Sequence, residues 1–109
     1  MKIFFTTEKN GKPEELILQK ERSKNGNYLI SALAIDKGKN RCLDFNGRIY
    51  FSALNAGRLL NNLGTSVRSS IIEMANGKAQ IKYKHIPLHK GIVEVRNQDF
   101  KGTYITIDE

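Results

Sequence analysis

"RCLDFNGRIYFSALNAGRLLNNLG", residues 41–64, is the stretch that decides the predicted fold class. Its Asn46-Gly47 pair accepts the positive φ values of a type I′ turn and predicts a hairpin between RCLDF and RIYFS. From Ser52, a favourable N-cap residue, apolar residues recur at helical spacing as far as Leu63, and a glycine follows. The stretch therefore predicts a strand that runs directly into an amphipathic helix from Ser52 to Leu63.

Toward the amino terminus, two more Asn-Gly pairs separate runs that are typical of strands. Asn10-Gly11 and Asn25-Gly26 are therefore expected to be hairpin turns as well. The run YLISALAI is apolar on both faces, which predicts a central strand covered on both sides, although its Ala and Leu content also allows a helix. The first half is thus predicted to be a five-strand antiparallel meander, with strands at 2–8, 15–23, 27–35, 41–45 and 48–52.

Toward the carboxyl terminus, a second short helix is expected from Thr65 or Ser66, with the Asn76-Gly77 pair interpreted as its end and not as a hairpin. Three strands follow, at 79–86, 91–97 and 102–108. The predicted fold class is α+β. An antiparallel β-meander packs against one main helix, with a short second helix and C-terminal strands, as a single domain over residues 1–109.

Composition restricts the class of protein. A chain of 109 residues can bury one core, and no apolar run approaches the ~20 residues of a membrane span. The amino terminus lacks the apolar region of a secretory signal. The single cysteine, Cys42, excludes an internal disulfide and fits a reducing compartment. We therefore expect a cytoplasmic protein with no membrane partner.

The net charge of +7 is unevenly distributed. Residues 37–90 contain ten basic and only two acidic residues, whereas the remainder contains eight basic and nine acidic residues. A field of this kind attracts phosphate groups, although a lysine-rich solubilising surface has the same composition.

Basic and aromatic residues alternate in the predicted strands. The strand period places Arg48 and Tyr50 on one face and Ile49 and Phe51 on the other. In QIKYKHI the same period places Lys82 and Lys84 on one face, opposite Ile81 and Tyr83. Cations along a backbone and rings stacked on bases are how proteins hold single-stranded nucleic acid, whereas any single tyrosine can equally be a core residue. The candidate nucleic-acid-binding residues are Lys37, Lys39, Arg41, Arg48, Tyr50, Lys82, Tyr83, Lys84, Arg22, Lys24 and Tyr28.

No reacting group is indicated. The only histidines, His85 and His89, flank Pro87, and a zinc site needs at least a third ligand. The two glycines of NAGRLLNNLG match neither a dinucleotide fingerprint nor a P-loop. We therefore expect no catalytic residue, no metal and no cofactor, and the protein is not predicted to be an enzyme.

The order of elements from Asn25 to Leu63 comprises NGNYLISALAI, a basic turn, GRIYFS and the leucine-rich helix. In this order the chain resembles the Whirly and PUR-type single-stranded nucleic-acid-binding domains. The resemblance implies an antiparallel sheet of four strands followed by a helix, and pairing as dimers or repeats. A second short helix and three further strands depart from that pattern.

The function predicted from sequence is largely sequence-independent binding of single-stranded DNA or RNA through a basic and aromatic sheet face. The alternative is a small phage or mobile-element protein that binds or inhibits a protein partner. A homodimer fits either interpretation.

Overall fold

The computed structural model describes residues 13–23, 26–61, 63 and 65–108. These residues form nine strands and no helix, so nothing in them offers a helix that could cross a membrane. The strands are β1 (Glu15–Arg22), β2 (Tyr28–Ile35), β3 (Arg48–Asn55), β4 (Arg58–Leu60), β5 (Ser66–Val67), β6 (Ser69–Glu73), β7 (Lys78–Lys84), β8 (Gly91–Asn97) and β9 (Phe100–Ile107). The predicted α+β class, with its main helix, is wrong.

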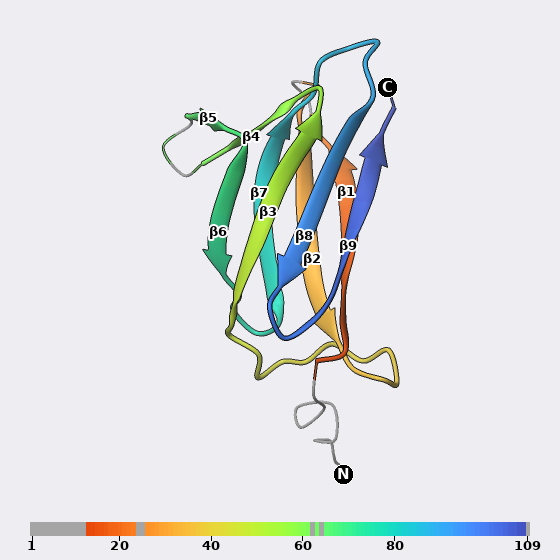
Figure 1. The fold of residues 1–109 in the computed structure, drawn as a ribbon, viewed down its shortest axis with the longest axis vertical. Coiled ribbons are helices and arrows are strands. Elements are labelled where there is room, and N and C mark those ends of the chain that lie inside the picture. The colour runs from red at the N-terminus through yellow and green to blue at the C-terminus, as the bar shows by residue number, and fades with distance from the viewer. Residues whose placement is uncertain (1–12, 24–25, 62, 64, 109) are drawn as a thin grey trace.

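The strands form two layers that face each other (Figure 1). The first sheet has the order β5-β4-β7-β2-β1 and the second has the order β9-β8-β3-β6, and a parallel pairing of Glu15 with Lys101 joins β1 to β9. Within this arrangement, β1-β2-β7-β4 and β3-β8-β9 have the strand order of an immunoglobulin constant-type sandwich. The short strands β5 and β6 are additions between β4 and β7.

Alternation along the strands builds the core between the two layers. Each central strand points every second side chain inward, because successive side chains of a strand lie on opposite faces. The buried side chains include Ile30, Ala32 and Tyr83 from the first sheet and Ile49, Phe51, Val93 and Val95 from the second. The structure thus confirms the predicted alternation of Ile49 and Phe51 with Arg48 and Tyr50.

The described residues of the predicted main helix, 52–61 and 63, form no helix, because the chain turns after β3. Asn55 and Gly57 both have positive φ, at 70° and 96°, and the chain then enters β4 in the other sheet. Leu59 is fully buried, whereas Leu63, at the end of the predicted apolar stripe, is 89% exposed. A glycine in a helix interior costs about 1 kcal/mol relative to alanine, and here it is required for the turn.

The second predicted helix is also wrong, because residues 66–73 form β5 and β6. Asn76 and Gly77, interpreted as a helix end, form a two-residue turn with φ values of 55° and 73°. Ala75 and Lys78 close it by exchanging backbone hydrogen bonds of 3.0 and 3.1 Å. This is the type I′ geometry that Asn-Gly favours.

The meander prediction was right for part of the first half. The strands predicted at 15–23, 27–35 and 48–52 are present, and Gly26 lies between the antiparallel strands β1 and β2, whereas Asn25 lies outside the described residues. Residues 41–45 form no strand apart from a single bridge from Arg41 to Ile35, so Asn46-Gly47 lies in the connection between the sheets. Residues 2–8 and Asn10-Gly11 lie outside the described residues. The three C-terminal strands are confirmed.

The strand register gives a prediction about stability. Phe51 is fully buried, and Phe51→Ala should lower the free energy of unfolding by about 3–5 kcal/mol through the cavity it leaves. Tyr50→Ala, on the outer face, should cost only about 1 kcal/mol. Urea unfolding of both variants checks this, and a larger loss for Tyr50→Ala would contradict the register.

The buried thiol gives a prediction about pH. Burial, with a smaller contribution from Asp36, raises the pKa of Cys42 above its ordinary value of 9.0. The unfolded thiol ionises at a lower pH than the folded one, so ionisation favours the unfolded state. The free energy of unfolding is therefore unaffected by ionisation of Cys42 well below pH 9.0 and falls as the pH rises through the native pKa. From about pH 8 to about pH 10, the free energy of unfolding should therefore fall more steeply in the wild type than in Cys42→Ala. Equal slopes in urea unfolding would contradict this expectation.

Candidate functional site

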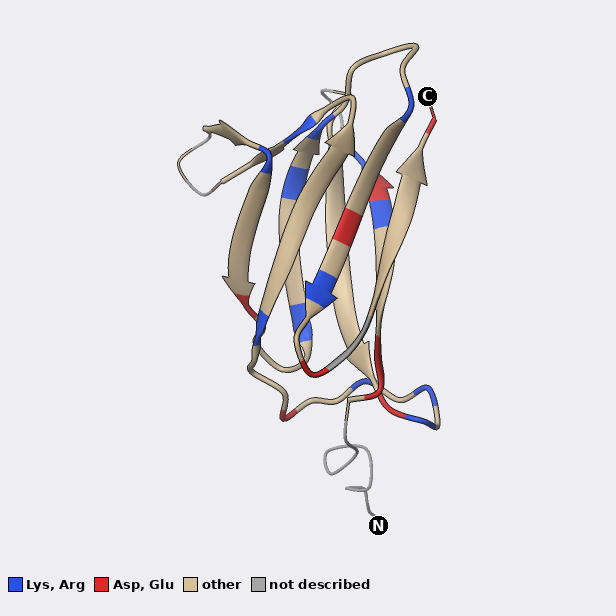
Figure 2. Cartoon of the chain, in the orientation of Figure 1, with Lys and Arg blue, Asp and Glu red and all other residues tan. Residues whose placement is uncertain are grey.

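The basic residues selected from the sequence lie on several strands and loops (Figure 2). Lys37, Lys39 and Arg41 lie in the connection between β2 and β3, where Lys39 is 3.6 Å from Glu15 and the Arg41 side chain donates to the Asn76 carbonyl. Arg22 is exposed at the end of β1, and Lys24 lies outside the described residues. These side chains therefore do not form one surface.

The strand residues of that selection lie on opposite sides of the sandwich. Arg48 and Tyr50 belong to the outer face of the second sheet, where Arg48 pairs in register with Glu73. Lys82 and Lys84 are exposed on the outer face of the first sheet. The selection thus mixes two separate faces.

Two of the three selected tyrosines are core residues. Tyr28 is 6% exposed and Tyr83 is fully buried, so neither ring is available to stack on a base. The Tyr83 hydroxyl donates to the Ala56 carbonyl, and a Cβ at Gly57 or Gly91 would overlap that hydroxyl. Burial raises the pKa of Tyr83, and the nearby Arg58 guanidinium opposes that rise.

The outer face of the first sheet does gather basic side chains. Here "the basic face" means Arg58 on β4 together with Lys78, Lys82 and Lys84 on β7. Arg58 stands directly opposite Lys84 in the antiparallel register, a position in which like charges destabilise a sheet. The strands β2, β4 and β7 contain no acidic residue that could neutralise them.

Ion pairs do not compensate for this arrangement. The ion pairs of Lys39 with Glu15, at 3.6 Å, and of Arg96 with Glu94, at 3.7 Å, both lie away from the basic face.

Arg58 is partly buried, and Nη1 of its guanidinium donates to the Gly57 carbonyl at 2.7 Å, which holds the guanidinium close to the backbone. Glu21 on β1 lies in the same cross-strand row as Leu29 and Lys82, two strands away from Lys82. The basic face is therefore positive over β4 and β7, is bordered by an acidic residue on β1, and has one anchored member, Arg58.

Polar and apolar groups lie between these charges. Leu60, Lys82 and Leu29 form one cross-strand row, and the two leucines are half-buried. In the next row the Gln80 amide donates to the Ser31 hydroxyl at 3.0 Å. The face thus offers apolar patches and hydrogen-bonding groups beside the cations.

A cleft of about 590 Å³ borders the basic face beyond the end of β4, and residues of β7 and β6 line it. Its walls include Lys82 and Gln80 from β7, Asn61 after β4, and Ser70 and Glu73 from β6. Its volume lies within the range of small-molecule sites, about 300–1,000 Å³.

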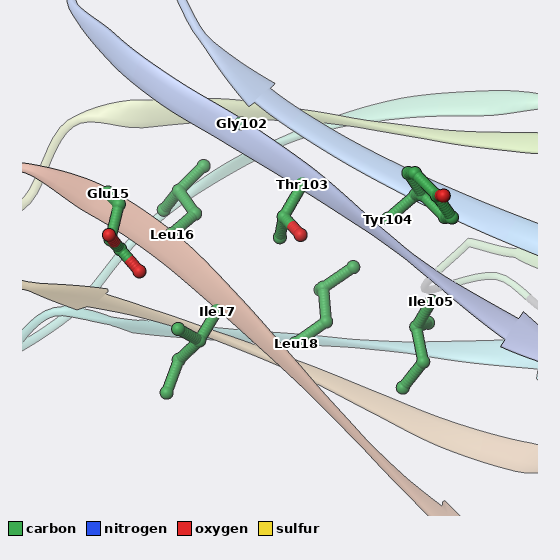
Figure 3. A pocket seen from close by; sticks show the side chains of 8 residues that line it. All are labelled: Glu15, Leu16, Ile17, Leu18, Gly102, Thr103, Tyr104 and Ile105. Carbon is green, nitrogen blue, oxygen red and sulfur yellow. The ribbon is translucent and has the colours of Figure 1, made fainter.

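A second hollow of about 340 Å³ lies at the seam between β1 and β9 (Figure 3). Leu16, Leu18 and Ile105 line it, with Tyr104 at its rim. It contains no cation, and Lys20 bridges the seam separately by donating to the Thr106 carbonyl at 2.8 Å. Glu15 and Thr103 add a carboxylate and a hydroxyl to this lining.

Metal ligands do not converge in the part of the chain that the structure describes, where no three His, Cys, Asp or Glu side chains come together. His85 packs between the Tyr28 and Tyr83 rings, with centroids 5.9 and 6.1 Å away, and neither ring nitrogen has a hydrogen-bond partner. His89 is exposed in the following loop.

Comparisons with known proteins point to glycosidases. No protein-family model matches the chain. It is 46% identical over 97% of its length to a putative beta-glucuronidase of Formosa agariphila, but spans only 13% of that protein. Among solved structures, the beta-glucuronidase of Parabacteroides merdae matches 90% of the chain with a TM-score of 0.78 and 26% identity. Beta-glucuronidase 3 of Bacteroides uniformis matches 91% with a TM-score of 0.75 and 30% identity. The chain covers 12% and 13% of these two structures.

These findings overturn the functional interpretation of the sequence. The resemblance to Whirly and PUR-type domains is wrong, because the relatives are beta-glucuronidases and the described residues contain no helix. Binding of single-stranded DNA or RNA is contradicted for the same reason, and the phage or mobile-element alternative has no support among the relatives. The expectation of a non-enzymatic protein is also wrong, since the relatives are named as hydrolytic enzymes. The single domain and the cytoplasmic location stay predictions.

Sequence reasoning missed Arg58. It was assigned to a helix, so its position opposite Lys84 could not be foreseen, although it belongs to the basic half of the chain. The parity of Lys82 and Lys84 was predicted correctly.

The like-charge pair gives a prediction. Lys84→Glu places a carboxylate opposite Arg58 and should raise the free energy of unfolding by about 0.2–1 kcal/mol. The gain should shrink at high salt, which screens exposed charges. Urea unfolding at low and high salt measures it. Lys37→Glu makes the same change in charge on a loop and is the control, and an equal gain there would contradict a local effect.

Proposed function

We propose that this chain forms a β-sandwich domain of a glycosidase that hydrolyses β-glucuronides. The observation that carries this proposal is the 46% identity to a putative beta-glucuronidase over 97% of the chain. Identities of 26% and 30% to two solved beta-glucuronidases, over nine-tenths of the chain, support the same assignment.

The chain is much shorter than its relatives, which limits the part it can play in such an enzyme. The chain corresponds to 13% of the Formosa relative, so most of such an enzyme is supplied by other parts of the polypeptide. Glycosidases cleave with a pair of carboxyl groups on either side of the scissile bond. The domain adds a stable two-layer scaffold and its surface to that machinery.

The proposal predicts a substrate preference. The natural protein that contains this chain, at full length, should release nitrophenol from p-nitrophenyl β-D-glucuronide much faster than from the matching β-glucoside, which lacks the carboxylate. Absorbance of nitrophenol measures both rates. Equal rates, or hydrolysis of the glucoside alone, would contradict the proposal.

The same protein tests the contribution of this domain. Phe51→Ala should lower the temperature at which glucuronide hydrolysis is lost, because it weakens the core of the sandwich. Tyr50→Ala is the matched control on the outer face and should change that temperature less.

A further inference from the structure

We infer that the basic face binds the carboxylate groups of a polyuronate, a glycan built from uronic acid units. This inference rests on the proposed function and adds to it a second contact with the acidic glycan, away from the reacting bond. It concerns the surface made by Arg58, Lys78, Lys82 and Lys84.

Charge is the first argument. The strands β4 and β7 contribute four cations, and β2, β4 and β7 contain no acid. Like charges face each other at Arg58 and Lys84, and the acid in the row of Lys82, Glu21, lies two strands away on β1. A like-charge pair of this kind lowers the free energy of unfolding, and such locally destabilising arrangements are common at binding surfaces. A ligand with negative charges would remove the repulsion.

Spacing is the second argument. Lys82 and Lys84 are two residues apart on one strand, so their side chains leave the sheet about 7 Å apart, and Lys78 continues the same row. A line of cations matches a linear polymer with a charge on each unit. A lysine ammonium group is a point charge on a flexible side chain, so it can follow a carboxylate to different positions. The anchored guanidinium of Arg58 can bind a carboxylate in a fixed direction.

The groups between the cations favour a sugar over a nucleic acid. Half-buried Leu29 and Leu60 flank Lys82 and can cover the apolar side of a sugar ring. The exposed Gln80 amide, held by its hydrogen bond to the buried Ser31 hydroxyl, can bond to hydroxyl groups. Bases need aromatic rings to stack on, but the aromatic residues of β2, β4 and β7, Tyr28 and Tyr83, point inward.

The bordering cleft extends the surface. Lys82 and Gln80 belong both to the basic face and to the wall of the cleft, whose volume is about 590 Å³. A glycan lying along β7 can therefore place one unit in the cleft while its neighbours stay on the open sheet. Because Glu73 also lines the cleft and repels anions, the carboxylate of that unit would have to face Lys82.

The test measures binding of the full-length protein to an oligogalacturonate by isothermal titration calorimetry. This polyuronate is α-linked, so the activity proposed above does not consume it, and a neutral malto-oligosaccharide of equal length is the reference. The face variant is Lys82→Gln with Lys84→Gln. The matched control is Lys37→Gln with Lys39→Gln, which removes two lysine charges from exposed sites in the connection between β2 and β3.

We expect oligogalacturonate to bind more tightly than the neutral oligosaccharide. The face variant should weaken this binding by about tenfold, as when a charge-assisted contact is lost, and the control by less than about twofold. Because Lys84→Gln removes a like charge opposite Arg58, we expect the face variant to stay folded. The melting temperatures of both variants check this.

Several results would overturn the inference. Equal losses in the face variant and the control would show a general effect of net charge. Binding no tighter than that of the neutral oligosaccharide would show that the face does not recognise carboxylates. Equally tight binding of a single-stranded oligonucleotide of the same charge, lost in the same variant, would show a face that accepts any polyanion.

Hydrolysis of the aryl glucuronide, measured on the same preparation, separates this inference from the proposed function. Hydrolysis without oligogalacturonate binding overturns the inference alone. Binding through the basic face without hydrolysis supports the inference and contradicts the proposed function.

Discussion

The buried ring of Tyr83 is the constraint on which one end of the sandwich depends. Its hydroxyl donates to the Ala56 carbonyl, and Gly57 and Gly91 leave the space it occupies. These contacts connect β7 to the crossover between β3 and β4 and to the start of β8. Because a phenol in an apolar interior requires a hydrogen-bond partner, the position of this crossover is tied to the position of one strand.

The outward side chains of β7 follow from that inward anchor. With Ala79, Ile81 and Tyr83 packed in the core, the alternation of a strand leaves Lys78, Lys82 and Lys84 on the outer face. The crossover held by Tyr83 then brings Arg58 into register opposite Lys84. The basic face is thus a consequence of core packing, since the same ring that fills the interior sets the place of the cations outside it.

Local signals in the sequence predicted individual strands well and their assembly poorly. The alternation in RIYFS and QIKYK correctly separated buried from exposed residues, because it depends on neighbours along one strand. The stripe from Ala56 to Leu63 fitted a helix equally well, and only Tyr83, distant in sequence, explains why Gly57 turns there instead. Asn76-Gly77 was assigned to a helix end because the preceding apolar residues fitted a helical period, although their isoleucines and valine also favour strands. The basic face needed the pairing of β4 with β7, which no local pattern contains.

The parallel pairing of β1 and β9 has a mechanical consequence. Both strands run in the same direction, so chain entering β1 and chain leaving β9 depart from opposite ends of the sandwich (Figure 1). Tension along the polypeptide would therefore pull these two strands past each other. The pairing of Glu15 with Lys101 and the hydrogen bond from Lys20 to Thr106 would carry this load together, in shear, and would not open one after the other. The seam between the two sheets is then the first part of the domain to resist stretching.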